Sequence, residues 1–133
     1  MIKKIDHIGI AVENLETQLK FYTDVLGLTC SGIEEVAEQK VKVAMLQVGE
    51  VRIELLQPIS GDSPIAKYLE KRGEGIHHIA YLVTDLEGSL QRLEEQQVRL
   101  IDSKPRIGAG GHKIAFLHPK SSFGVLTEMC EHR

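Results

Sequence analysis

The sequence contains an internal repeat, and this repeat limits the folds that the chain can adopt. The segment from His7 to Leu19 matches the segment from His78 to Leu90 at a constant offset of 71 residues. Each copy predicts a short apolar strand followed by an amphipathic helix. Asn14 and Asp85 stand at the start of these helices, where a side-chain oxygen can accept a hydrogen bond from the first free N–H groups. The chain is therefore expected to build its fold from two related modules.

Three further β segments follow the helix in each copy. They are rich in β-branched residues and bounded by turn residues, and they are expected at 28–34, 41–48 and 51–56, then at 98–101, 113–117 and 125–129. Between the copies, Ser63, Pro64 and Gly73 predict a linking helix at about 63–73. One module has too few strands to close a core, whereas two supply eight. We expect an α+β fold: a single domain over 1–133, with module 1–60 and module 74–133 joined by this helix and forming a cupped eight-stranded mixed sheet.

Composition narrows the class of protein. The chain has 133 residues, 42% of them hydrophobic and 26% charged, with a net charge of −3. This balance is typical of a globular domain and lacks the basic excess of a nucleic-acid binder. No apolar run approaches the ~20 residues of a membrane span, and the start has no signal-peptide core, so we expect a cytoplasmic protein with no membrane partner. Cys30 and Cys130 are too few for a disulfide framework and are expected to be reduced.

Four polar residues stand at repeat-related places on the expected strands. His7 and His78 begin equivalent strands, and Glu54 and Glu128 interrupt the apolar runs of the last strand of each module. Two imidazoles and two carboxylates suit divalent Zn, Ni, Co, Mn or Fe. A strand glutamate on a solvent-exposed face is the alternative, because buried unpaired carboxylates are costly. His77 competes with His78, but only His78 matches His7 in the repeat register, and strand alternation sends His77 to the opposite face.

At these residues the chain resembles the vicinal oxygen chelate superfamily, and within it the methylmalonyl-CoA epimerase family. The resemblance covers the chain nearly end to end, in the segments 7–12, 54–58, 62–66, 75–80, 107–113 and 116–120. It implies that His7, Glu54, His78 and Glu128 bind one divalent metal ion per chain, with cobalt favoured and Ni, Mn and Zn as alternatives. It also implies a small-molecule acyl-CoA substrate, a homodimer and a place in propionate metabolism.

The resemblance implies proton abstraction at C2 of methylmalonyl-CoA and reprotonation through a metal-stabilised enolate. Glu128 is the expected acid/base, with Glu54 serving the opposite face. Some family members place a second catalytic glutamate where this chain has Val43, which cannot transfer a proton. The glycine-rich segment 108–111 predicts a hairpin or a loop over the substrate, and Lys113 or Lys120 could meet its anionic groups. Glyoxalase I is the nearest alternative activity, and a non-enzymatic small-molecule-binding protein is the alternative from another class.

Overall fold

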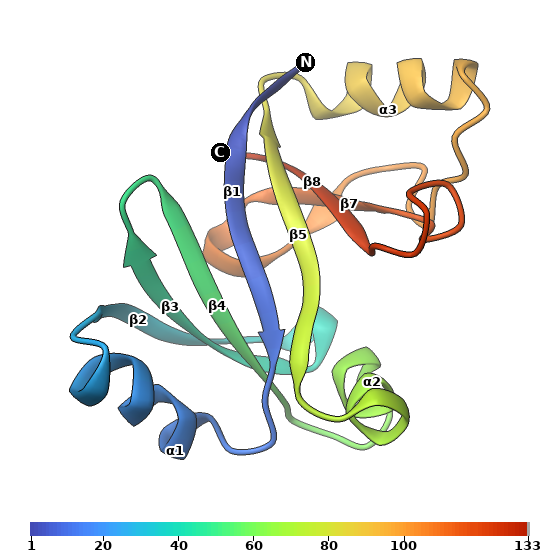
Figure 1. Ribbon diagram of the computed structural model, residues 1–133. Helices are drawn as coiled ribbons and strands as arrows, with labels where there is room; N and C mark the ends of the chain where they lie inside the picture. The colour runs from blue at the N-terminus through green and yellow to red at the C-terminus, as the bar shows by residue number, and fades with distance from the viewer. Residues whose placement is uncertain (133) are drawn as a thin grey trace. The chain divides into compact units, whose positions relative to one another are not determined.

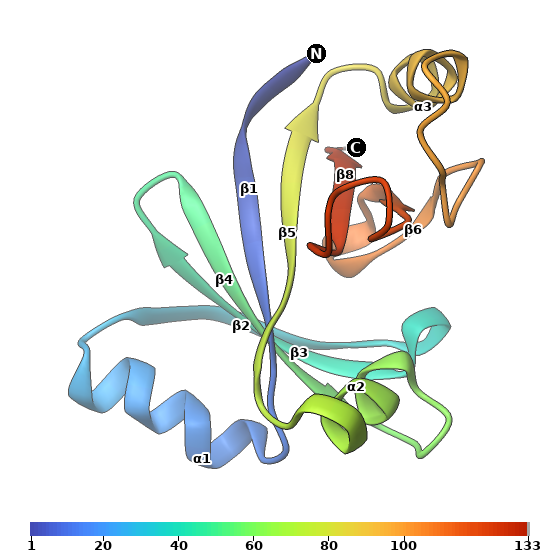
Figure 2. The ribbon, with the colours of Figure 1, turned by 45° about the vertical axis from the view of Figure 1, so that its right-hand side comes forward.

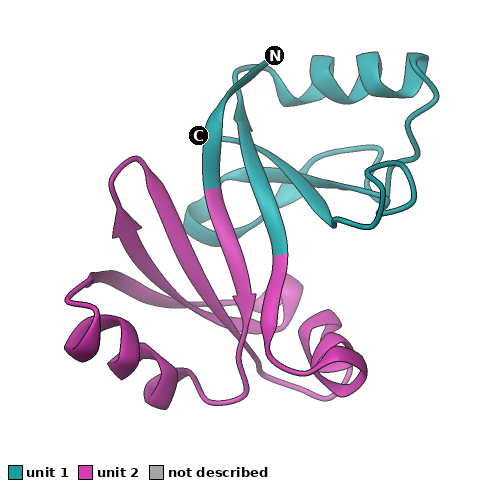
Figure 3. Cartoon of the chain, in the orientation of Figure 1, with its two compact units in different colours: residues 1–6, 78–133 teal, residues 7–77 magenta. Residues whose placement is uncertain are grey.

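The computed structural model describes residues 1–132, which form two compact units (Figure 3). One unit is His7–His77, and the other combines Met1–Asp6 with the chain from His78 onward. Strands β1 (Ile2–Ala11) and β5 (Gly75–Val83) each contribute residues to both units. Among the described residues, no helix is both long and apolar enough to cross a membrane.

The unit His7–His77 contains four strands in the order β2-β3-β4-β1. After β1 come helix α1 (Leu15–Lys20), a π-helical turn (Phe21–Val25), β2 (Thr29–Val36), a 3₁₀ turn (Ala37–Gln39), β3 (Val41–Val48), β4 (Val51–Pro58) and helix α2 (Pro64–Arg72). β1 and β4 are parallel, and the other pairs are antiparallel. Helix α1 packs against β3 and β4, as Figures 1 and 2 show from two sides.

Helix ends in this unit follow the sequence signals. The Asn14 side chain accepts a hydrogen bond from the Thr17 backbone N–H at 3.0 Å, which caps α1. Ser63 caps α2 by accepting from the Ile65 N–H at 3.2 Å. Gly27 and Gly73 both have φ of 76°, a conformation that glycine adopts without steric cost, and α2 stops at this second glycine.

The unit from His78 repeats the same plan with the strand order β5-β8-β7-β6. It contains helix α3 (Leu86–Glu95), β6 (Arg106–Ile107), a 3₁₀ turn (Ala109–Gly111), β7 (Lys113–Leu117) and β8 (Thr127–Glu131). β5 and β8 are parallel, as β1 and β4 are in the first unit. Asp85 caps α3 by accepting from the Gly88 N–H at 3.1 Å.

Each unit buries one apolar sheet face beneath its helix. In the first unit Leu15 of α1 packs into a cluster with Ala44, Leu46 and Leu55. In the second unit the corresponding cluster contains Leu86, Leu90, Ala115, Leu117 and Met129. Because side chains alternate along a strand, Glu54 and Glu128 lie on the faces turned away from these helices.

The expected α+β fold of two βαβββ modules with eight strands is confirmed. The linking helix is α2, and the glycine-rich segment forms the short hairpin between β6 and β7. The prediction of a strand at 98–101 is wrong. In this segment Leu100 forms one isolated bridge, to Leu117, and the second unit takes its fourth strand from β6. The Ile101 and Asp102 N–H groups both donate to the Phe116 carbonyl, which ends the pairing there.

Candidate metal centre and active site

In the first unit, Glu54 lies in β4 directly between Gly9 of β1 and Met45 of β3. His7 is two residues before Gly9, so its side chain projects from the same face of the sheet as the Glu54 side chain. His7 Nδ1 is 3.5 Å from Glu54 Oε2, and both residues are at most 5% exposed. The parallel register of β1 and β4 therefore produces a buried imidazole–carboxylate pair.

Arg52 accompanies this pair. Its Nη2 donates a hydrogen bond of 3.1 Å to Glu54 Oε2, the same oxygen that His7 approaches. The Arg52 side chain is 18% exposed, against 4% for Glu54. A buried carboxylate needs such a charged partner, so Arg52 helps to hold the Glu54 charge inside the fold.

The second unit contains the equivalent pair. Glu128 of β8 lies between Ala80 of β5 and Phe116 of β7, and His78 stands two residues before Ala80. His78 Nε2 is 3.3 Å from Glu128 Oε1, and these residues are also at most 5% exposed. The rings of Phe116 and His78 pack in a T-shaped arrangement, with centroids 5.4 Å apart and an interplanar angle of 83°.

The two pairs share one local design. Gly9 and Ala80 are related by the repeat offset, and each lies directly opposite the carboxylate residue. Neither carries more than one methyl group, so the position beside each glutamate on the histidine's own strand holds no bulky side chain, whereas Met45 and Phe116 flank the glutamates on the other side. Each unit thus presents one imidazole nitrogen and one carboxylate oxygen from a buried face, a donor set that fits a divalent metal ion. The alternative of solvent-exposed strand glutamates is wrong for both residues.

The remaining sequence candidates are not part of the two His–Glu pairs. His77 packs its ring against Tyr68 of α2, with centroids 4.9 Å apart. Val43 is buried in β3 at 1% exposure, two residues from Met45. His118 follows β7 and its Nδ1 accepts from the Lys120 N–H; desolvation lowers its pKa, and the charges of Arg99 and Lys120 lower it further.

Sequence reasoning missed a polar cluster in the second unit. Asp6 Oδ1 is 2.7 Å from His132 Nε2, and the ligand atoms of Asp6, His132 and Cys130 lie within 4.8 Å of one another. His112 stacks on His132 with ring centroids 4.4 Å apart. These residues come from opposite ends of the chain and have no repeat partners, so no periodic signal marks them. Cys30 and Cys130 are both outside any disulfide, as expected.

The chain is similar to known proteins over nearly its whole length. Residues 6–116 match the model of the Glyoxalase/Bleomycin resistance protein/Dioxygenase superfamily. The ethylmalonyl-CoA/methylmalonyl-CoA epimerase of Cereibacter sphaeroides is 39% identical over 131 residues, which are 97% of this chain and 98% of that protein.

Two solved structures share its fold closely. A methylmalonyl-CoA epimerase in complex with methylmalonyl-CoA and NH4+ is 38% identical, with a TM-score of 0.96 over 99% of this chain and 96% of that chain. A variant of the Streptomyces coelicolor methylmalonyl-CoA epimerase in complex with 2-nitronate-propionyl-CoA gives the same identity, TM-score and coverage.

Proposed function

Because the chain belongs to the Glyoxalase/Bleomycin resistance protein/Dioxygenase superfamily, we propose that it is a metal-dependent epimerase that interconverts (R)- and (S)-methylmalonyl-CoA. The observation that carries the proposal is the pair of buried His–Glu sites at repeat-related positions. The similarity to epimerases over the full chain supports the choice of substrate.

In this proposal His7, Glu54, His78 and Glu128 bind one divalent metal ion per chain. Two carboxylates balance the charge of such an ion, and two imidazoles complete a mixed N/O donor set. Cobalt is the favoured ion, with Ni, Mn and Zn as alternatives. When bound, the ion supplies a Lewis acid for the thioester and carboxylate oxygens that flank C2.

The chain's own carboxylates then move the proton. Glu128 starts ionised and takes the proton from C2 on one face, while Glu54 starts protonated and delivers its proton to the other face, so that the configuration inverts. Proton exchange with water then restores the starting protonation states. Glu54 accepts a charged hydrogen bond from Arg52, which lies on the same strand.

The ligand of one similar structure fits this chemistry. A nitronate holds its carbon planar and spreads negative charge over oxygen atoms, as an enolate at C2 does. The binding of 2-nitronate-propionyl-CoA by the Streptomyces coelicolor epimerase variant therefore supports an enolate-forming reaction for this chain. We extend the proposal to a cytoplasmic homodimer with one site in each chain.

Exchange of the C2 proton in D₂O tests the proposal. Purified protein loaded with cobalt should epimerise methylmalonyl-CoA and incorporate deuterium at C2, and His7→Ala and His78→Ala should lose most of the bound cobalt. The paired assay uses methylglyoxal with glutathione, the substrates of glyoxalase I. Turnover in this second assay alone, or full activity of both histidine variants, would overturn the proposal.

A further inference from the structure

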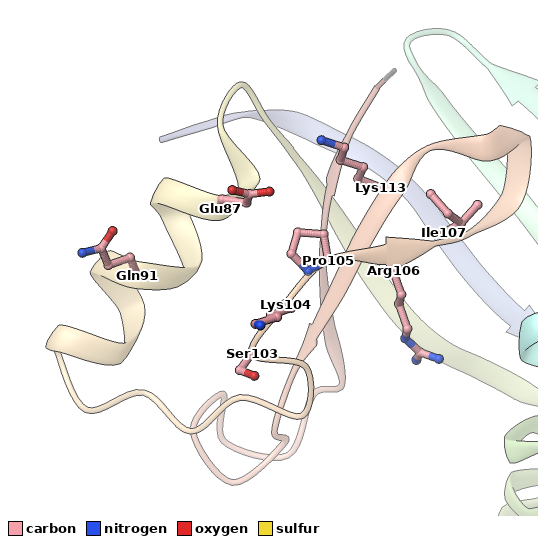
Figure 4. A pocket seen from close by; sticks show the side chains of 8 residues that line it. All are labelled: Glu87, Gln91, Ser103, Lys104, Pro105, Arg106, Ile107 and Lys113. Atoms are coloured by element: carbon pink, nitrogen blue, oxygen red, sulfur yellow. The ribbon is translucent and has the colours of Figure 1, made fainter.

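A pocket of about 630 Å³ lies in the second unit, within the volume range of small-molecule sites. Figure 4 shows Glu87 on α3 at one side and the segment leading into β6 at the other. Three of its lining residues are cations, Lys104, Arg106 and Lys113. None of the histidines and glutamates of the two His–Glu pairs lines this pocket, which lies on the sheet face covered by α3.

The lining residues carry a net positive charge, which favours binding of an anion. Glu87 is the one carboxylate among the lining residues. Within residues 1–132, neither Lys104 nor Lys113 is within ion-pair distance of a carboxylate, and Arg106 pairs through Nε with Asp102 at 3.3 Å. Figure 4 shows the Lys104 and Lys113 amines directed toward the side of the pocket that faces α3. Among residues 1–132, these two ammonium groups thus have no carboxylate partner, and both line one concave surface.

The pocket also has an apolar wall. Pro105 and Ile107 line it beside the cations, and Ile107 is 49% exposed, although it belongs to a strand. Such a wall can pack against a purine or an alkyl chain while the lysines bind phosphate. The combination suits a ligand that carries phosphate groups on an organic body better than it suits a bare inorganic anion.

The short strand β6 connects this pocket to the His78–Glu128 pair. Ile107 pairs with Lys113, and Arg106 pairs with Ile114. Because side chains alternate along a strand, the side chains of these two residues of β6 project from opposite faces of the sheet. The Arg106 side chain leaves the pocket, as Figure 4 shows, and its guanidinium lies 5.6 Å from the centre of the Phe116 ring. Phe116 in turn contacts His78. β6 is the edge strand and has two residues, so a long ligand can pass around it.

We propose that this pocket binds the phosphate groups of the coenzyme A moiety while the acyl group is held on the face of His78 and Glu128. The inference rests on the proposed function for its acyl-CoA ligand. Lys104 and Lys113 contact the phosphates, and Pro105 and Ile107 pack against the organic part. Binding of the coenzyme A moiety should then weaken with increasing salt, because exposed charge pairs are screened.

Calorimetric titration with free coenzyme A tests the pocket without catalysis. Lys104→Gln/Lys113→Gln removes two charges from exposed positions and preserves their stems. The Kd of coenzyme A should rise at least about tenfold, since charge-assisted contacts to phosphate are lost. The Kd of pantetheine, which lacks the phosphates, should be unchanged. Lys71→Gln, a substitution of an exposed lysine on α2, is the matched control and should bind coenzyme A like the wild type.

Two competition results complete the test. Diphosphate should displace coenzyme A from the wild type and bind the double variant at least tenfold more weakly. Equal coenzyme A affinity in the double variant and the wild type would overturn the pocket proposal, as would a larger loss for Lys120→Gln. Failure of the proposed function is separate: it would appear as absent epimerisation in a protein that still binds coenzyme A through Lys104 and Lys113.

Discussion

Arg52 is expected to contribute to stability through its contact with Glu54. Arg52→Met keeps most of the apolar stem and removes the guanidinium that donates to Glu54 Oε2 at 3.1 Å. Removing one partner of a fully buried ion pair costs about 3–5 kcal/mol. Arg52 retains 18% exposure and His7 remains near the carboxylate, so a smaller loss of about 2–3 kcal/mol is expected for the metal-free protein.

Urea denaturation of metal-free protein measures this loss, and a thermal scan should show a decrease in Tm of roughly 10 °C for a chain of this size. The Arg52→Met/Glu54→Gln double variant should be more stable than Arg52→Met, because it also removes the buried charge that lost its partner. Lys40→Met is the matched control: the Lys40–Asp62 ion pair has exposed side chains, and its loss should change the unfolding midpoint very little.

The result that refutes this reasoning is specific. If Arg52→Met unfolds within about 0.5 kcal/mol of the wild type, the guanidinium does not stabilise the buried carboxylate. If the double variant is no more stable than Arg52→Met, the loss does not come from an unpaired Glu54 charge.

Three further outcomes are expected. Glu128→Gln keeps one oxygen ligand but removes the base, so cobalt should stay bound while epimerisation slows at least ~10²-fold; wild-type rates of inversion and of C2 exchange would place the chemistry elsewhere. Ala80→Val puts two methyl groups beside Glu128, and should lower cobalt affinity measured by titration more than Ala115→Val, a substitution beneath α3. Hydrogen bonds from Lys40 and Ser60 lower the pKa of Asp62 from 3.8 to about 2. At this exposed site the ion pair contributes little to stability, and the small contribution is present above the unfolded pKa and lost as the pH falls through about 2. NMR titration of Lys40→Met should show the Asp62 pKa returning toward 3.8.

The repeat made the paired site predictable from sequence. An offset of 71 residues relates His7 to His78, and a strand period of two fixes which neighbours share a face. The parallel pairing of β1 with β4 and of β5 with β8 then brings each histidine beside one glutamate. The helix N-caps were also predictable from sequence, because the side chains of Asn14, Ser63 and Asp85 accept hydrogen bonds from backbone N–H groups no more than three residues away.

Features that depend on distant contacts were not predictable. The apolar residues near Leu100 favoured a strand, yet the Phe116 carbonyl takes the N–H groups of Ile101 and Asp102 and Leu100 makes a single bridge. The same limit hid the Asp6–His132 contact, which joins residues 126 positions apart. Local patterns report pairing within a segment, and they carry no information on which remote carbonyl or carboxylate will face it.

Val43 and Arg52 together bear on how a two-face reaction can run in this chain. Val43 is buried on β3 and pairs with Leu56, while Met45, two residues on, pairs with Glu54. The expected second glutamate position is therefore the diagonal neighbour of Glu54 on the same sheet face. A carboxylate at both places would need two cations, and Arg52 contacts Glu54. A valine at position 43 avoids a second buried charge, and in the proposed mechanism Glu54 becomes the carboxylate that serves the face opposite Glu128.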